Sequence, residues 1–412
     1  MTRTTLLPSI ACLMISLVAY PPQAANAQSN VVARLGPGVW YEIPSSQLEQ
    51  VAYPWPANVI TTKNGVGFKA VIGNWSGGAY DTRRDRLLIW GGGHFAYAGN
   101  EIYGFDLGHL RWQRLSEPSL EIDLDYRAGD DIYIDGKPRS NHTYGSLQYV
   151  PVVDRFCSFG TSANFPASRG GPTTWAYDFS AGKWERKSPA PGFGFGTSSA
   201  WDPVTQRIWI RLNGKEGMLA EWDPVKDHWT ARARGLEHKT WFDQSAAIDP
   251  LGRRYVAVGG GKIRTYDLSS PGSIIQRDIR TSGPQDIVAA TNPGFEYDPI
   301  IDKFVGWNGG ADIFTLDPET WQWQRLPPAA SNRTRPTPAA KNGTFGRFRY
   351  VPSRNVYVVV NSVRENVYIY RLSDLQRAAI PPRLAAATRS TDAMLAGWAS
   401  RQSSMFKHGP SN

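Results

Sequence analysis

The stretch from Trp75 to Trp112 reads WSGGAYDTRRDRLLIWGGGHFAYAGNEIYGFDLGHLRW and contains four short runs of β-forming residues. Asp81 stands in the turn after the first run, Gly91–Gly93 follow the second, and Asp106 ends the third. Short apolar and aromatic runs bounded by Gly, Asp and charged turn residues are typical of antiparallel strands. The stretch therefore predicts one sheet of four antiparallel strands.

The same pattern recurs along the chain at intervals of about fifty residues, which suits a repeat of four short strands. The five further copies begin near Tyr149, Ala200, Ala247, Phe295 and Phe348. The last copy lacks its fourth strand, and Gly38–Ile43 has the composition of the missing one. Closing such sheets into a ring removes their unpaired edges.

The sequence thus predicts an all-β fold, a β-propeller of six four-stranded antiparallel blades over residues 32–376, closed by an N-terminal strand. A ring of seven blades is the alternative, if residues 57–73 form a further one.

Both ends of the chain are expected to lie outside the propeller. Arg3 precedes an apolar run from Leu6 to Ala19, and Ala25–Ala27 match a small-x-small cleavage site, so residues 1–27 are a predicted signal peptide. The apolar run is shorter than the ~20 residues of a membrane span. Residues 377–412 are an Ala- and Ser-rich tail. We therefore expect a secreted or periplasmic monomer that leaves the membrane after cleavage.

The composition excludes several classes of protein. With 41% hydrophobic and 20% charged residues the chain can bury a core, which excludes global disorder. Two cysteines exclude a disulfide scaffold and any multi-thiolate metal site. The formal charge of +9 favours an anionic partner. Nucleic acid is not the expected partner, because no basic run or nucleic-acid-binding motif is present.

The Gly91–Gly93 cluster, the aromatic-Asp pairs such as Phe105-Asp106, and the Trp that follows them resemble kelch repeats and the galactose-oxidase-like propellers. The resemblance covers the chain from Trp75 to Asp374. It implies the propeller fold, whereas the activity stays open, because propellers carry many unrelated functions. Secreted propellers that are similar in outline include polysaccharide lyases.

The long loops of the predicted ring hold most of the unusual residues. In a four-stranded blade the second-to-third turns and the connections between blades lie on one face, which we call the loop face. Function concentrates in long loops on a rigid scaffold. The candidate catalytic residues on this face are His94, Tyr97, His142 and Tyr144, and the candidate substrate-binding residues are Asn100, Arg211, Lys239, Trp241, Arg347 and Arg364.

These residue types suit cleavage of an acidic, uronate-containing polysaccharide by β-elimination. The reaction needs a base for the C5 proton and an acid for the leaving oxygen. We expect His142 to act as the base, Tyr144 or Tyr97 as the proton donor, and His94 as a partner that orients the base.

The same reaction needs a cation against the uronate carboxylate, and Arg211 or Arg347 could provide a bidentate one. No cofactor is expected for it. A structural divalent cation is left open, since His94 and Glu101 could ligate one.

Two other functions remain as alternatives. A non-catalytic kelch-type module would bind carbohydrate or protein through the same face, with Trp241, Tyr97 and Phe95 stacking on sugar rings. A galactose-oxidase-like copper enzyme is disfavoured, because that resemblance requires a thioether-linked cysteine. After cleavage of the signal peptide only Cys157 remains, in a predicted buried strand.

Overall fold

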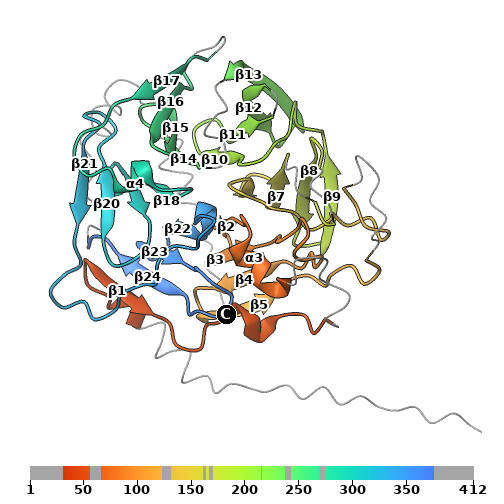
Figure 1. The fold of residues 1–412 in the computed structure, drawn as a ribbon, viewed down its shortest axis with the longest axis horizontal. Coiled ribbons are helices and arrows are strands. Elements are labelled where there is room, and N and C mark those ends of the chain that lie inside the picture. The colour runs from red at the N-terminus through yellow and green to blue at the C-terminus, as the bar shows by residue number, and fades with distance from the viewer. Residues whose placement is uncertain are drawn as a thin grey trace, which may run out of the picture.

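The computed structural model describes residues 31–55, 66–122, 131–160, 164–166, 170–214, 216–236, 243–269, 272 and 274–374. Their strands form six four-stranded antiparallel sheets arranged as a ring (Figure 1). The predicted six-bladed propeller is thus confirmed. The described part of residues 57–73 contains η2 (Gly67–Lys69) and α3 (Ala70–Gly73) rather than a blade.

Each blade consists of four consecutive strands in sheet order, except the last one, which takes its outermost strand from the N-terminus. Blade 1 has β2 (Gly78–Asp81), β3 (Arg86–Ile89), β4 (Tyr103–Asp106) and β5 (Arg111–Arg114). Blade 2 has β6 (Leu147–Val150), β7 (Arg155–Phe159), β8 (Thr174–Asp178) and β9 (Lys183–Lys187). Blade 3 has β10 (Ser198–Asp202), β11 (Arg207–Asn213), β12 (Gly217–Asp223) and β13 (His228–Leu236).

The second half of the ring follows the same plan. Blade 4 has β14 (Ser245–Asp249), β15 (Arg254–Gly259), β16 (Lys262–Asp267) and β17 (Gln276–Ile279). Blade 5 has β18 (Gly294–Asp298), β19 (Lys303–Trp307), β20 (Ile313–Leu316) and β21 (Trp323–Leu326). Blade 6 has β22 (Phe348–Val351), β23 (Val356–Val359), β24 (Tyr368–Arg371) and β1 (Val39–Glu42). Short helical turns η1 (Leu48–Val51), α4 (Asp286–Ala289) and η3 (Phe345–Arg347) lie in the connections.

The ring closes through the predicted N-terminal strand. β1 pairs antiparallel with β24, with Trp40 opposite Tyr370. The Trp40 ring packs 4.7 Å from Tyr370 and 6.1 Å from Trp307, and its indole N–H donates to the Ala311 carbonyl at 2.9 Å. Figure 1 shows β1 beside β24. One strand therefore joins the two ends of the described chain by main-chain pairing and by a buried tryptophan.

The hydrophobic core lies between the blades. Six clusters of buried side chains among the described residues each join two neighbouring blades. Leu88 of blade 1 packs in one cluster with Phe156 of blade 2, and Val305 of blade 5 packs with Tyr357 of blade 6 in another. Cys157 is buried in β7, as predicted, and burial raises the pKa of its thiol.

Repeated turns and ion pairs occupy the face opposite the loop face. The first-to-second turn of every blade contains one residue with a left-handed backbone, namely Asp85, Asp154, Gln206, Arg253, Asp302 and Asn355. Ion pairs between blades link these turns: Arg84 bonds Asp154, Arg253 bonds Asp202, and Arg354 bonds Asp85. Charged residues on this face therefore form ion pairs that connect neighbouring blades.

The predicted signal peptide, residues 1–27, and the tail, residues 377–412, lie outside the described residues. Within the described ranges, no helix has the length and apolar character to cross a membrane. Export and the secreted or periplasmic location stay predictions.

Candidate functional site

The Gly91–Gly93 cluster allows the connection between blades 1 and 2 to lie directly against the end of β3. The Gly92 N–H donates to the Asn141 carbonyl and the Gly93 N–H to the Ser140 hydroxyl, both at 3.0 Å. A Cβ on Gly93 would stand 2.1 Å from the Asn141 Cα, a distance that only glycine permits. This close approach brings His142 next to His94, which follows the glycines.

His142 lies at the centre of a group of rings. Its centroid is 5.1 Å from those of His94 and Trp75 and 6.0 Å from that of Tyr144. The imidazole is 3% exposed, and its Nε2 has no hydrogen-bond partner. Burial, with a smaller effect from His94, lowers the pKa of His142 from 6.5 to about 3. His142 is therefore neutral at physiological pH.

Tyr144 extends this group across the axis of the ring. Its ring packs edge to face on Phe345, 6.1 Å away, and on Phe195, 6.5 Å away. Phe345 leads into β22 of blade 6 and Phe195 leads into β10 of blade 3, and these two blades are opposite each other in a six-bladed ring. Figure 1 shows the first strands, among them β2, β10 and β22, nearest the centre. The rings that precede these strands thus meet at one end of the axis.

We call this group the axial mouth. It consists of Trp75, His94, His142, Tyr144, Phe195 and Phe345. Trp75, His94 and Phe195 are partly exposed, whereas the other three are buried. A main-chain bond joins two members of the mouth, because the Tyr144 N–H donates to the Trp75 carbonyl at 2.7 Å. The Phe345 N–H donates to the carbonyl of Asn292, outside the mouth, at 3.2 Å.

Four of the six mouth residues have a left-handed backbone. The φ angles are 47° at Trp75, 54° at His94, 47° at Tyr144 and 50° at Phe345. This conformation is uncommon for bulky residues and costs on the order of 1–3 kcal/mol each. Such strain persists only where the surrounding bonds impose it, and it clusters at functional sites. The mouth is therefore a preorganised arrangement of rings.

The two buried arginine candidates bond to protein atoms. Arg347 is fully buried and donates to the carbonyls of Ser76, Val360 and Gly343, at 2.8 and 2.7 Å for the first two. Burial lowers its pKa to about 9. Arg211 is 1% exposed, and its Nε–H donates to the Tyr266 hydroxyl at 2.9 Å.

Tyr97 and Asn100 are buried in the loop between β3 and β4. The Tyr97 hydroxyl donates to Glu101 at 2.9 Å. The Asn100 amide donates to the Ser119 hydroxyl and the Pro138 carbonyl, at 3.0 and 2.9 Å, and its oxygen accepts the Ser119 N–H. These bonds anchor the loop that carries His94.

The structure therefore brings together three of the predicted site residues, His94, His142 and Tyr144. Arg364 is exposed and pairs with Glu49 at 2.9 Å. Lys239 and Trp241 lie outside the described residues. The catalytic and substrate-binding roles assigned from the sequence stay predictions.

Sequence reasoning missed three members of the mouth, Trp75, Phe195 and Phe345. Each of them is followed within two residues by glycine, just before the first strand of a blade, and Tyr144-Gly145 has the same pattern. An aromatic residue followed by glycine at that point of the repeat is the signal that could have identified them.

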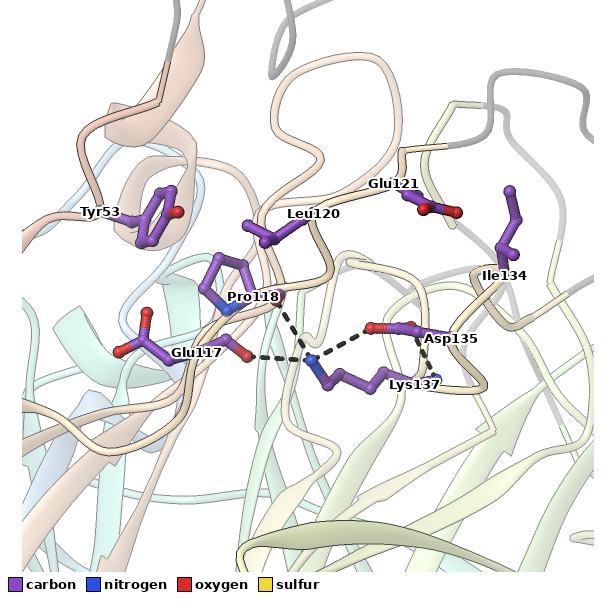
Figure 2. Close-up of a pocket in the computed structure, with 8 residues that line it drawn as sticks. All are labelled: Tyr53, Glu117, Pro118, Leu120, Glu121, Ile134, Asp135 and Lys137. Carbon is purple, nitrogen blue, oxygen red and sulfur yellow. Dashed lines mark hydrogen bonds and ion pairs between the residues drawn. The ribbon is translucent and has the colours of Figure 1, made fainter. Parts of the chain in front are cut away.

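A separate pocket of about 480 Å³ lies along the connection between blades 1 and 2 (Figure 2). It is lined by Tyr53, Glu117, Pro118, Leu120, Glu121, Ile134, Asp135 and Lys137. The Lys137 ammonium donates to the carbonyls of Glu117 and Pro118 and pairs with Asp135, as Figure 2 shows. These bonds show that Lys137 stabilises the connection between blades 1 and 2. The pocket shares no residue with the axial mouth.

No protein-family model and no curated protein matches the chain. Among solved structures, an auxiliary nutrient binding protein from Bacteroides thetaiotaomicron VPI-5482 is 9% identical, covering 71% of this chain and 68% of that one, with a TM-score of 0.46. A nidogen/laminin complex contains a chain that is 8% identical, covering 63% of this chain and 81% of its own length, with a TM-score of 0.41.

The expected relationship to kelch proteins or polysaccharide lyases is not confirmed by these matches and stays a prediction. The strand order of the six sheets identifies the chain as a six-bladed β-propeller.

Proposed function

We propose that the protein binds a carbohydrate chain at the axial mouth. The observation that carries the proposal is the left-handed backbone of Trp75, His94, Tyr144 and Phe345, four bulky rings held in a strained conformation at one end of the axis. Ordinary turns explain left-handed residues at the opposite face, whereas these four precede a first strand or follow the glycine cluster. Preorganised aromatic surface of this kind binds with little loss of conformational entropy.

The chemistry of the mouth suits sugars. Pyranose rings present C–H faces that pack on aromatic faces, and Trp75 and Phe195 are the partly exposed aromatic rings for such contacts. Hydroxyl groups need partners that can donate and accept, and the neutral imidazoles of His94 and His142 provide both. Acidic polysaccharides are the first class to test, because the chain has a net charge of +9.

The experiment compares two tryptophan variants against a panel of polysaccharides by isothermal titration calorimetry. Trp75→Ala removes a mouth ring, and we expect at least a tenfold loss of affinity, about 1.4 kcal/mol. Trp321→Ala is the matched control. Trp321 is also partly buried and left-handed, with φ of 56°, but it lies in the β20–β21 turn of the opposite face. The proposal fails if the two variants bind alike, or if the native protein binds no polysaccharide.

A second candidate is the polysaccharide lyase predicted from the sequence. It is favoured by the neutral His142, whose buried Nε2 could accept a proton, with the Tyr144 ring 6.0 Å away as the acid. We rank it below binding because the guanidinium groups of Arg211 and Arg347 bond to protein acceptors. Neutralisation of a uronate carboxylate would then need another cation of the loop face.

The ultraviolet absorbance of unsaturated uronate products separates the two candidates. A lyase should produce it with at least one acidic polysaccharide, and His142→Ala should lower turnover by at least ~100-fold. His109→Ala is the control, because His109 is exposed and pairs with Asp106 in the β4–β5 turn. Binding without any rise in absorbance would eliminate the lyase and leave the binding function intact.

A further inference from the structure

The separation of His94 and His142 matches that of two ligands on one metal ion. Their ring centroids are 5.1 Å apart and the ring planes meet at 77°. Two imidazoles that bind a tetrahedral ion through nitrogens about 2.0–2.1 Å from it have ring centres about 5 Å apart. The separation of the two rings is therefore compatible with a shared ion.

A second observation points to a ligand at the same place. Nε2 of His142 and Oδ1 of Asn141 are both buried and have no hydrogen-bond partner, in residues that are 3% and 5% exposed. Buried polar atoms in native proteins are almost always paired, so such atoms call for a bound water or ion. Both atoms belong to the segment that the glycine cluster holds next to His94.

The ligand atoms also limit the choice of metal. Neutral imidazole nitrogens suit Zn²⁺, Cu²⁺ and Ni²⁺ rather than Mg²⁺ or Ca²⁺, which prefer oxygen ligands.

We propose that His94 and His142 form a binding site for a divalent transition-metal ion such as Zn²⁺ or Ni²⁺. Among the described residues, no group of three or more His, Cys, Asp or Glu side chains lies close enough together to hold a metal. Two imidazoles occupy two of the four positions of a tetrahedral ion. Metal binding here does not depend on whether the mouth binds carbohydrate.

The test uses metal-free protein without a histidine tag, titrated with Zn²⁺ and with Ni²⁺ by calorimetry in the absence of any sugar. The variants are His94→Asn and His142→Gln, and the matched control is His109→Gln. Asn adopts the left-handed backbone of position 94 more readily than most residues, so His94→Asn should fold. We expect the native protein and His109→Gln to bind one ion with equal affinity. The affinity of each site variant for the ion should be at least tenfold lower.

A visible spectrum of the Co²⁺ form gives a second readout, since nitrogen ligation should produce bands that both site variants lack. Thermal unfolding adds a third, because a bound ion raises the Tm of the native protein and of the control. The inference is overturned if the native protein shows no saturable binding. The inference is also overturned if a folded variant that combines His94→Asn and His142→Gln binds the ion as tightly as the native protein.

Discussion

The imidazole rings of His94 and His142 lie edge to face with their centroids 5.1 Å apart, although they come from different connections of the propeller. His94 belongs to the loop between β3 and β4, and His142 to the connection that leads into β6. The glycine cluster permits their contact, and the surrounding rings bury one of them. The proposed metal site depends on that contact.

Replacing His142 by Gln should make the free energy of unfolding fall less steeply as the pH decreases. The pKa of His142 is about 3 in the folded protein and about 6.5 in the unfolded chain. Between these two pH values the imidazole is protonated in the unfolded chain and neutral in the folded protein. The group's contribution to stability is therefore present above pH 6.5 and is lost as the pH falls towards 3, by about 1.4 kcal/mol per pH unit.

Urea unfolding of the native protein and of His142→Gln at pH 7, 6, 5 and 4 measures this contribution. The free energy of unfolding of the native protein should fall more steeply with decreasing pH than that of the variant. Parallel curves would show that His142 titrates normally in the folded protein.

Replacing Glu101 by Gln should stabilise the protein more at pH 8 than at pH 4. Glu101 is 1% exposed, and its Oε1 accepts bonds from the Trp55 indole at 2.7 Å and the Tyr97 hydroxyl at 2.9 Å. Burial raises the pKa of its carboxyl group. The stability linked to the protonated form is present at low pH and is lost as the pH rises through the folded pKa.

The glutamine oxygen can accept the same two hydrogen bonds and carries no charge. The variant should therefore not lose this stability as the pH rises. Denaturant unfolding at the two pH values gives the comparison. Glu117→Gln is the control, because Glu117 is exposed and pairs with Arg114. An equal effect of Glu101→Gln at both pH values would contradict the prediction.

Replacing Arg347 by Met should destabilise the protein by about 3–5 kcal/mol, because three buried carbonyls lose their donor. Those carbonyls belong to Ser76, Gly343 and Val360, and they join blade 6 to the start of blade 1. Arg364→Met removes only an exposed ion pair with Glu49 and should cost less than about 1 kcal/mol. Denaturant midpoints of the two variants test this, and similar small shifts in both would show that Arg347 does not brace the ring.

Replacing Gly93 by Ala should separate His94 from His142. The new Cβ would meet Asn141 backbone atoms at 2.1, 2.5 and 2.6 Å, so the main chain of one segment must move. We expect a cost of about 1–3 kcal/mol from the overpacking, together with loss of Zn²⁺ binding.

Gly73→Ala is the matched control, because a Cβ there meets no atom within 4 Å. It should leave both stability and metal binding unchanged or slightly improved, since Ala favours a helical turn such as α3. If Gly93→Ala behaves like this control, the glycine cluster does not position the histidines.

Much of the fold could be predicted from the sequence. The strands repeat with turns of recognisable chemistry, and Gly38–Ile43 was expected to complete the last blade, as β1 does beside β24. These features are local or periodic, because the strands are short apolar runs bounded by turn residues that are near neighbours in the chain.

The candidate site could be predicted only in part. The loop face, His94, His142 and Tyr144 followed from the blade repeat, because the repeat defines which connections share a face. The sequence could not show that Arg211 and Arg347 bond to protein atoms, since their partners come from other strands and other blades. Arg211, expected in a loop, lies in strand β11, and Arg347 lies in η3. A charged side chain looks the same in the sequence whether it faces a ligand or bonds to another blade.

The sequence by itself determined the four-stranded repeat and the strand that closes the ring, because both depend on short-range patterns of apolar residues, glycines and turn residues. The structure decided between six and seven blades, since the described part of residues 57–73 forms η2 and α3. Only the tertiary structure decided which side chains meet at the axis. Tyr144 touches Phe345 and Phe195 because ring closure places blades 6 and 3 on opposite sides of it. Contacts between residues so distant in the chain arise from the packing of whole blades. Local sequence patterns do not predict such contacts.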